Sequence, residues 1–323
     1  MKILVTGGAG YAGSVMTRHL LAEGHKVRVL DALLYGGHGL AGLSGESRYQ
    51  FLQGNICVAG DLERALEGVG AVVHLAAVVG DPACARQPAL ARQINVEGSM
   101  LLFEMAQKKG VERFLCASTC SNYGRMQDPS LYLTEDSPLR PVSLYAETKV
   151  AVEQALLSAS APSETAVTVL RFATLFGLSP RMRFDLTVNE FTMELLTKRS
   201  IKIYGEQFWR PYLHVRDASR AIGMVLDSPV ERVRGEAFNV GDTTQNYQKG
   251  QLVDLIRAQI NDPVRIERVS QVEDPRDYRV SFEKITKQLG FRITRTVEDG
   301  IREIAGAIRQ GAVTDFDNPS YRN

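Results

Sequence analysis

The chain has 323 residues, of which 44% are hydrophobic and 23% charged, and its formal net charge is +1. A net charge this small argues against a surface built to attract nucleic acid or an anionic membrane. No apolar run approaches the roughly 20 residues that span a bilayer. The four cysteines lack the spacing of a metal site, so we expect reduced thiols and no metal. Because the first strand begins at Lys2, we expect no signal peptide and a cytoplasmic location.

A glycine-rich turn follows the first expected strand. Residues 2–6 form a mostly apolar and β-branched run, and the sequence Gly-Gly-Ala-Gly-Tyr-Ala-Gly comes directly after them, at 7–13. Apolar residues then recur at helical spacing as far as Gly24. Gly7, Gly10 and Gly13 would let the backbone turn tightly and approach a pyrophosphate, which the helix N-terminus attracts. This strand, turn and helix predict a dinucleotide-binding loop, and a glycine turn without a cofactor is the alternative.

Asp31 ends the second expected strand, 26–30. An acidic residue about 20 positions beyond such a loop accepts hydrogen bonds from the adenosine ribose, and it would repel a 2′-phosphate. The sequence therefore predicts NAD rather than NADP.

Strands and helices then alternate along the chain. We expect strands at 49–56, 71–77, 113–118 and 167–172, and helices at 61–67, 93–109 and 144–158. Near-continuously apolar strands separated by helices favour a Rossmann-type α/β fold, a doubly wound parallel sheet covered on both faces. Ligands of such sheets bind beyond the carboxyl ends of the strands.

The pattern changes after Gly177, where strands become shorter and polar loops longer. We expect strands at 201–204, 209–215, 236–241 and 264–269, and helices at 188–197, 216–226, 249–260, 283–289 and 297–308. These elements predict a smaller α+β substrate domain that interleaves with the sheet. We assign 1–177 to the cofactor domain, with 211–241 returning to it, 178–210 and 242–313 to the substrate domain, and 314–323 to a loosely ordered tail.

Tyr145 and Lys149 lie four residues apart on an expected helix, so their side chains share a face. An ammonium near a phenol lowers the pKa of that phenol, which would make Tyr145 an acid/base group near neutral pH. Lys149 could also hold the nicotinamide ribose.

With these motifs the sequence resembles the extended short-chain dehydrogenase/reductase family of NAD-dependent sugar-nucleotide epimerases, dehydratases and reductases. The resemblance rests on the glycine loop, on Tyr145 and Lys149, and on further segments along the chain. Those segments are His74–Ala77, Asn95–Gly98, Arg171–Gly177, Arg210–Asp217 and Phe238–Gly241.

The resemblance implies two sets of ligand contacts. NAD would be bound by Gly7, Gly10, Tyr11, Ala12, Gly13, Asp31, Asn55, Ile56, Leu75, Ala76, Ala77, Asn95, Ser118, Tyr145, Lys149 and Phe172. A nucleotide-diphosphate sugar would be bound by Thr119, Cys120, Ser121, Tyr145, Asn189, Arg210, Tyr212 and Arg276. Arg279 is the alternative to Arg276 as the late phosphate-binding arginine, and a structural salt bridge is the alternative role for Arg210.

The family's catalytic Ser or Thr stands four residues before the Tyr of a Tyr-Gly pair, which is Tyr123-Gly124 here, so it corresponds to Thr119. The 4,6-dehydratases of the family carry Asp-Glu at the next two positions, where this chain has Cys120-Ser121. Neither side chain supplies that acid/base pair, which argues against 4,6-dehydration.

The resemblance therefore implies an NAD-dependent epimerase that acts through a transient keto-sugar, with hydride transfer at C4. The alternative is a keto-sugar-nucleotide reductase or dehydrogenase with the same catalytic residues, and a non-catalytic NAD-binding regulator is a third interpretation. Family resemblance also implies a homodimer through the helices at 95–109 and 145–157, which carry Met100, Leu101, Phe103, Val152 and Leu156. These five side chains could equally be internal core. Asn55, Asn122 and the loop 81–84 depart from the family pattern and leave the sugar open.

Overall fold

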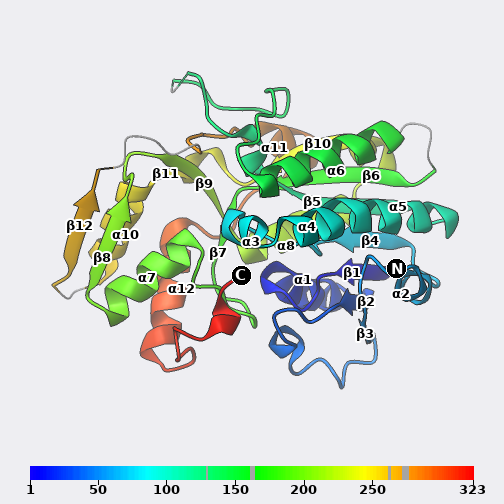
Figure 1. The fold of residues 1–323 in the computed structure, drawn as a ribbon, viewed down its shortest axis with the longest axis horizontal. Coiled ribbons are helices and arrows are strands. Elements are labelled where there is room, and N and C mark those ends of the chain that lie inside the picture. Colours follow the sequence, from blue (N-terminus) through cyan, green and yellow to red (C-terminus); the bar gives the residue numbers. More distant parts are fainter. Residues whose placement is uncertain (129, 161–163, 261–262, 271–275) are drawn as a thin grey trace.

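A seven-stranded parallel sheet forms the larger part of the protein (Figure 1). The computed structural model describes residues 1–128, 130–160, 164–260, 263–270 and 276–323. The strands lie in the order β10-β6-β5-β4-β1-β2-β3. Their bounds are β1 (Lys2–Thr6), β2 (Lys26–Asp31), β3 (Tyr49–Gln53), β4 (Ala71–His74), β5 (Arg113–Thr119), β6 (Ala166–Phe172) and β10 (Glu236–Val240). The predicted Rossmann-type α/β fold is confirmed.

The sheet is buried on both faces because alternate residues of its strands enter two separate cores. In β1, Ile3 and Val5 join one core and Leu4 joins the other. The first core includes side chains of α1 (Tyr11–Ala22), α8 (Val215–Asp227) and α11 (Glu283–Leu289). The second includes side chains of α2 (Ala59–Ala65), α5 (Ser99–Lys108) and α6 (Leu144–Ser160). Since all seven strands run parallel, their carboxyl ends meet at one edge of the sheet.

A smaller part lies beside that edge, at the left of Figure 1. It holds a three-stranded sheet of β7 (Thr174–Phe176), β9 (Trp209–His214) and β11 (Asn246–Gln248), and a pair of strands, β8 (Ser200–Tyr204) and β12 (Arg265–Val269). The helices α7 (Thr187–Thr197), α10 (Lys249–Gln259) and α12 (Val297–Arg309) pack together there around a separate apolar core.

The two parts are interleaved along the chain. After β9 the chain returns to the large sheet through α8 and β10, but β9 itself pairs with β7 and β11. The helix α11 packs against β10, so the segment 283–289 also belongs with the large sheet. The short helices α3 (Asp81–Arg86) and α4 (Pro88–Arg92) occupy a stretch where we expected no helix, and a π-helical turn, Gln93–Gly98, precedes α5.

The C-terminal segment is packed, which differs from the expectation of a loosely ordered tail. The rings of Phe316 and Tyr321 contact Phe184 edge-on, at centroid distances of 5.5 and 5.7 Å. The backbone N–H of Asn323 donates to Asp185 at 3.2 Å. The segment is mostly polar in sequence, so the packing of its two aromatic residues was not expected.

Within the described ranges, no helix is long and apolar enough to cross a membrane.

Candidate active site

The glycine loop has no room for side chains at two of its positions. Gly7 has φ +76°, and a Cβ there would lie 2.8 Å from the backbone N of Ala76. A Cβ on Gly13 would lie 2.1 Å from the carbonyl O of Gly7. The backbone therefore forms a tight turn at the start of α1, as a pyrophosphate-binding loop requires.

Asp31 holds this loop from the end of β2. One carboxylate oxygen accepts from the N–H of Ala9 at 2.9 Å and the other from the N–H of Leu33 at 2.8 Å. Burial raises the pKa of the carboxyl group, and the two hydrogen bonds oppose that shift. The carboxylate thus lies at the carboxyl edge beside the glycine loop, where the ribose of a dinucleotide is expected.

Two predicted ligand contacts, Tyr11 and Asn189, have side chains that join the two parts of the protein. The Tyr11 hydroxyl donates to the carbonyl of Gly177 at 2.7 Å, and Asn189 accepts from the N–H of Gly177 at 3.0 Å. The Asn189 amide also donates to the carbonyl of Arg183 at 2.9 Å. Both side chains are buried, and their polar atoms are hydrogen-bonded within the protein.

Two predicted cofactor-site amides organise loops at the same edge. The Asn95 side-chain Oδ1 accepts from the N–H of Val78 at 2.7 Å, and the side-chain Nδ2 donates to the Thr148 hydroxyl at 3.1 Å, which links the loop after β4 to α6. Asn55 accepts from the N–H of Cys57 at 2.9 Å and so shapes the turn after β3. The other predicted cofactor residues, Ile56, Leu75, Ala76, Ala77 and Phe172, follow or end β3, β4 and β6.

Tyr145 and Lys149 lie on α6, as predicted. The buried Lys149 ammonium donates to the carbonyl of Ala117 at 2.9 Å, and burial lowers its pKa. Burial raises the pKa of Tyr145, and the Arg183 guanidinium acts in the opposite direction. The expectation that Lys149 lowers the pKa of Tyr145 was therefore wrong for this structure, because desolvation dominates at Tyr145 and the ammonium is directed to β5.

Thr119 ends β5 and caps the turn that follows. Its hydroxyl oxygen accepts from the N–H of Ser121 at 3.1 Å, and the Ser121 hydroxyl lies 3.2 Å from that of Tyr278. The Cys120 thiol is buried and donates to the carbonyl of Arg171 at 3.2 Å, and burial raises its pKa. Cys120 therefore points into the core, although we had grouped it with the substrate contacts.

The predicted phosphate-binding arginines both have partners. Arg210 donates to the carbonyl of Trp209 at 2.6 Å and stacks over the Tyr278 ring, 5.2 Å from its centroid. Arg276 pairs with Asp81 at 2.9 Å, and Ser143 donates to the other Asp81 oxygen at 2.7 Å. The predicted substrate contact Tyr212 is buried in the core of the smaller part.

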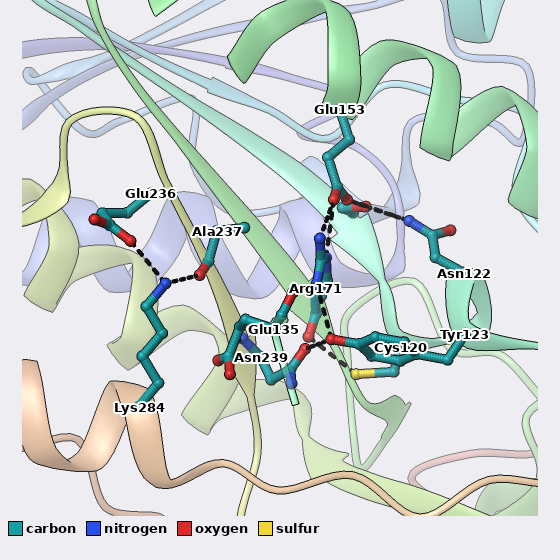
Figure 2. A network of polar contacts seen from close by, with 11 residues as sticks. Cys120, Asn122, Tyr123, Glu135, Glu153, Arg171, Glu236, Ala237, Asn239 and Lys284 are labelled. Atoms are coloured by element: carbon teal, nitrogen blue, oxygen red, sulfur yellow. Dashed lines mark hydrogen bonds and ion pairs between the residues drawn. The ribbon is translucent and has the colours of Figure 1, made fainter. Parts of the chain in front are cut away.

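Sequence reasoning missed a buried polar network beneath the end of β5, which Figure 2 shows. Glu153 on α6 and Arg171 on β6 form an ion pair at its centre, and both side chains are almost fully buried. One signal was present in the sequence, because Glu153 continues the four-residue spacing of Tyr145 and Lys149.

A groove of about 690 Å³ lies in the smaller part, away from Tyr145, Lys149 and Thr119. It is bordered by α7, β8 and β12, and its lining includes Glu190, Glu194, Lys202, Tyr204 and Arg265. Among the described residues, no group of three His, Cys, Asp or Glu side chains is placed to hold a metal ion.

Comparison with known proteins agrees with this geometry. Residues 3–241 match the model of the NAD dependent epimerase/dehydratase family. The chain belongs to this family. The prediction of an extended short-chain dehydrogenase/reductase is thereby confirmed.

Individual relatives have different activities. The chain is 32% identical over 310 residues to a dTDP-glucose 4,6-dehydratase of Streptomyces griseus, covering 93% of this chain and 91% of the relative. A dTDP-glucose 4,6-dehydratase from Streptomyces venezuelae, solved with NAD bound, superposes with a TM-score of 0.86 at 29% identity and covers 97% of this chain and 98% of its own. A UDP-glucose 4-epimerase from Thermotoga maritima, solved with UDP-glucose, gives a TM-score of 0.83 at 26% identity, with coverages of 97% and 100%.

The cofactor prediction is confirmed by the family and by neighbours that were crystallised with NAD. The glycine loop and Asp31 fit this cofactor, because the turn has no room for a Cβ at Gly7 or Gly13 and an acidic group lies at the end of β2. Family membership alone does not separate epimerase from dehydratase, since relatives have both activities.

Proposed function

We propose that the protein is an NAD-dependent epimerase of a nucleotide-activated sugar, acting through a transient ketone at C4. The turn after Thr119 is the observation that carries this choice. The dehydratases carry an Asp-Glu pair at the positions of Cys120 and Ser121, and here the first is a buried thiol bonded to the Arg171 carbonyl. The second is a serine paired with Tyr278. Neither side chain can exchange protons at two neighbouring carbons of the sugar.

NAD supplies the hydride acceptor for such a reaction. The Tyr145 hydroxyl is the proposed acid/base group for the sugar hydroxyl, and Thr119 is the proposed donor that orients the same oxygen. Because burial raises the pKa of Tyr145, positive charge around it is needed to favour the phenolate. Arg183 supplies part of that charge in the structure, and Lys149 lies one helical turn away.

4,6-Dehydration is the second candidate, because of the similarity to the dehydratase of Streptomyces griseus. Product mass distinguishes the two reactions. UDP-glucose and dTDP-glucose would be incubated with the purified protein and the products analysed by chromatography and mass spectrometry. An epimer has the mass of its substrate, whereas dehydration removes one water. A product that has lost water would reject the epimerase proposal.

We also propose the predicted homodimer through α5 and α6, although the apolar side chains of these helices leave little exposed surface for an interface. Phe103, Val152 and Leu156 are buried in the core of the subunit, and Met100 and Leu101 are half-buried against it. Light scattering at several protein concentrations tests the proposal, and a monomer mass throughout would contradict it.

A further inference from the structure

One face of α6 carries Tyr145, Lys149 and Glu153 on successive turns. Lys149 donates to the carbonyl of Ala117, and Glu153 accepts from the hydroxyl of Ser118 at 2.7 Å. Two consecutive residues at the end of β5 are therefore attached to the helix that bears Tyr145. The next residue along the strand is Thr119.

Glu153 uses both of its carboxylate oxygens (Figure 2). One accepts from Ser118 and, at 3.2 Å, from the Asn122 amide, which also donates to the Ser118 hydroxyl at 3.0 Å. The other accepts from Arg171 Nε at 2.9 Å. Ser118 precedes the turn that begins at Thr119 and Asn122 lies within it, so a single carboxylate holds that turn at two points.

Arg171 extends the attachment to the far end of the turn. It donates to the Tyr123 hydroxyl at 2.8 Å, and that hydroxyl donates to the Asn239 side chain on β10 at 2.7 Å. The turn is thus connected to α6, β6 and β10 at once.

The Glu153–Arg171 ion pair is buried, and burying charged groups costs free energy. The exposed fractions of Glu153 and Arg171 are 1% and 5%. Taking two charges out of water costs several kcal/mol per ion, and their attraction often does no more than offset that cost. An apolar pair would fill the space with no such cost, so stability alone does not account for the ion pair.

We propose that Glu153 is a positioning residue for the reaction. Through Ser118 and Asn122 it fixes the turn that carries Thr119 relative to Tyr145 on its own helix. The orientation of the Thr119 hydroxyl depends on that turn, because it accepts from the N–H of Ser121 within it. A displacement of about 1 Å in such a group can cost roughly 100-fold in rate. The catalytic readout of this proposal rests on the proposed function.

Two variants of the holoenzyme test the proposal. Asn122→Ala separates one side of the turn from Glu153 and leaves the pair with Arg171 intact. Glu153→Gln keeps the shape of the side chain but removes the charge that pairs with Arg171. Glu147→Gln is the matched control, because it removes a carboxylate from a half-exposed position on the same helix.

We expect Asn122→Ala to lower kcat with UDP-glucose or dTDP-glucose by roughly 10- to 100-fold, a loss typical of misplaced catalytic groups. KM and the affinity for NAD should change by less than about threefold, because the glycine loop and Asp31 are untouched. Amide hydrogen exchange should accelerate in 118–124 while the exchange of β1 and β4 stays as in the wild type. Glu147→Gln should match the wild type in every measurement.

Wild-type kcat and wild-type exchange at 118–124 in Asn122→Ala would overturn the proposal. So would a loss of activity no larger than the unfolded fraction explains. If Glu153→Gln does not fold, Asn122→Ala decides the question alone. If the wild type converts no nucleotide sugar, the proposed function fails, and the exchange rates still decide whether Glu153 fixes the turn.

Discussion

Arg276 and Asp81 form an ion pair in which the guanidinium Nη1 lies 2.9 Å from a carboxylate oxygen. The pair joins the start of α3 to the segment that carries Tyr278, and the Asp81 side chain also accepts from the Ser143 hydroxyl. Arg276 is, with Arg210, one of the predicted ligands of the substrate diphosphate. Diphosphate binding at Arg276 would therefore compete with Asp81.

This competition predicts that substitutions of Arg276 and Asp81 change nucleotide binding in opposite directions. Arg276→Ala should weaken the binding of UDP and dTDP by roughly tenfold or more, since a charge-assisted hydrogen bond contributes about 1.5–3 kcal/mol. Asp81→Asn should tighten it, because the amide holds the guanidinium less strongly. Isothermal titration calorimetry measures both constants. Unchanged binding in Arg276→Ala would remove this residue from the diphosphate site.

Asp81 also affects the proposed acid/base group. Its negative charge raises the pKa of Tyr145, as do burial and Cys84. Neutralising it in Asp81→Asn lowers that pKa, so a larger fraction of Tyr145 is phenolate at any given pH. The rising limb of kcat/KM against pH should therefore move to lower pH. A limb that stays in place, or that moves to higher pH, would contradict the assignment of Tyr145 as the base.

The glycine loop predicts a clear contrast between two alanine substitutions. In Gly13→Ala the new Cβ would lie 2.1 Å from the Gly7 carbonyl, so the backbone must move and NAD should be lost from the purified protein. In Gly60→Ala, in α2, the new Cβ meets nothing within 4 Å, so NAD content should equal that of the wild type. The dinucleotide released on denaturation, measured per protein chain, checks both. Full NAD content in Gly13→Ala would show that the loop does not approach the pyrophosphate.

His74 predicts acid sensitivity of the fold. It is fully buried between the hydroxyls of Thr6 and Ser99, each at 2.8 Å, and burial lowers its pKa to about 3. Ser99 donates to the Asn95 carbonyl, so it accepts from Nε2, and Thr6 donates to Nδ1. His74 is therefore neutral in the folded protein. Its pKa in the unfolded chain is about 6.5, so below that pH His74 binds a proton in the unfolded state but not in the folded state.

His74 should consequently make stability fall as the pH decreases from about 6.5 towards 3, with a slope of up to about 1.4 kcal/mol per pH unit. Urea unfolding of the wild type and of His74→Asn between pH 4 and 7 measures this contribution. The variant should show the shallower dependence. The matched substitution His38→Asn, at an exposed position, should leave the pH dependence of the free energy of unfolding as in the wild type. Equal slopes in the wild type and His74→Asn would mean that this histidine is not held neutral.

The large sheet could be predicted because its signals are local. The residues 2–6, 26–30 and 167–172 are mostly apolar or β-branched, and turns or helices with clear apolar spacing separate them. The strands β7 and β11 escaped prediction because each has only three residues and is defined by pairing with β9. A strand of three residues is too short to show an alternation of polar and apolar residues, and the sequence does not show its pairing with a distant segment.

For the candidate site, the sequence indicates which residues to consider but not the contacts that they make in the structure. The spacing of Tyr145 and Lys149 identified the helix face, whereas the pKa of Tyr145 depends on a burial that sequence spacing does not report. Cys120 shows the same limit, because a position next to Thr119 in sequence points into the core once the turn forms. Glu153 was missed because its partners Ser118 and Arg171 come from two other strands.

The redox balance during turnover tests most directly whether the protein is an NAD-dependent epimerase. NAD released from the denatured protein would be quantified, and NADH absorbance would be followed while UDP-glucose or dTDP-glucose is converted, with Tyr145→Phe as the inactive control. For the wild type we expect bound NAD, formation of an epimer of unchanged mass and no net NADH. Tyr145→Phe should keep its NAD and lose roughly 100- to 10,000-fold of the rate, the usual contribution of a general acid/base. Stoichiometric production or consumption of NADH would contradict an epimerase, and equal turnover in Tyr145→Phe would contradict Tyr145 as its acid/base group.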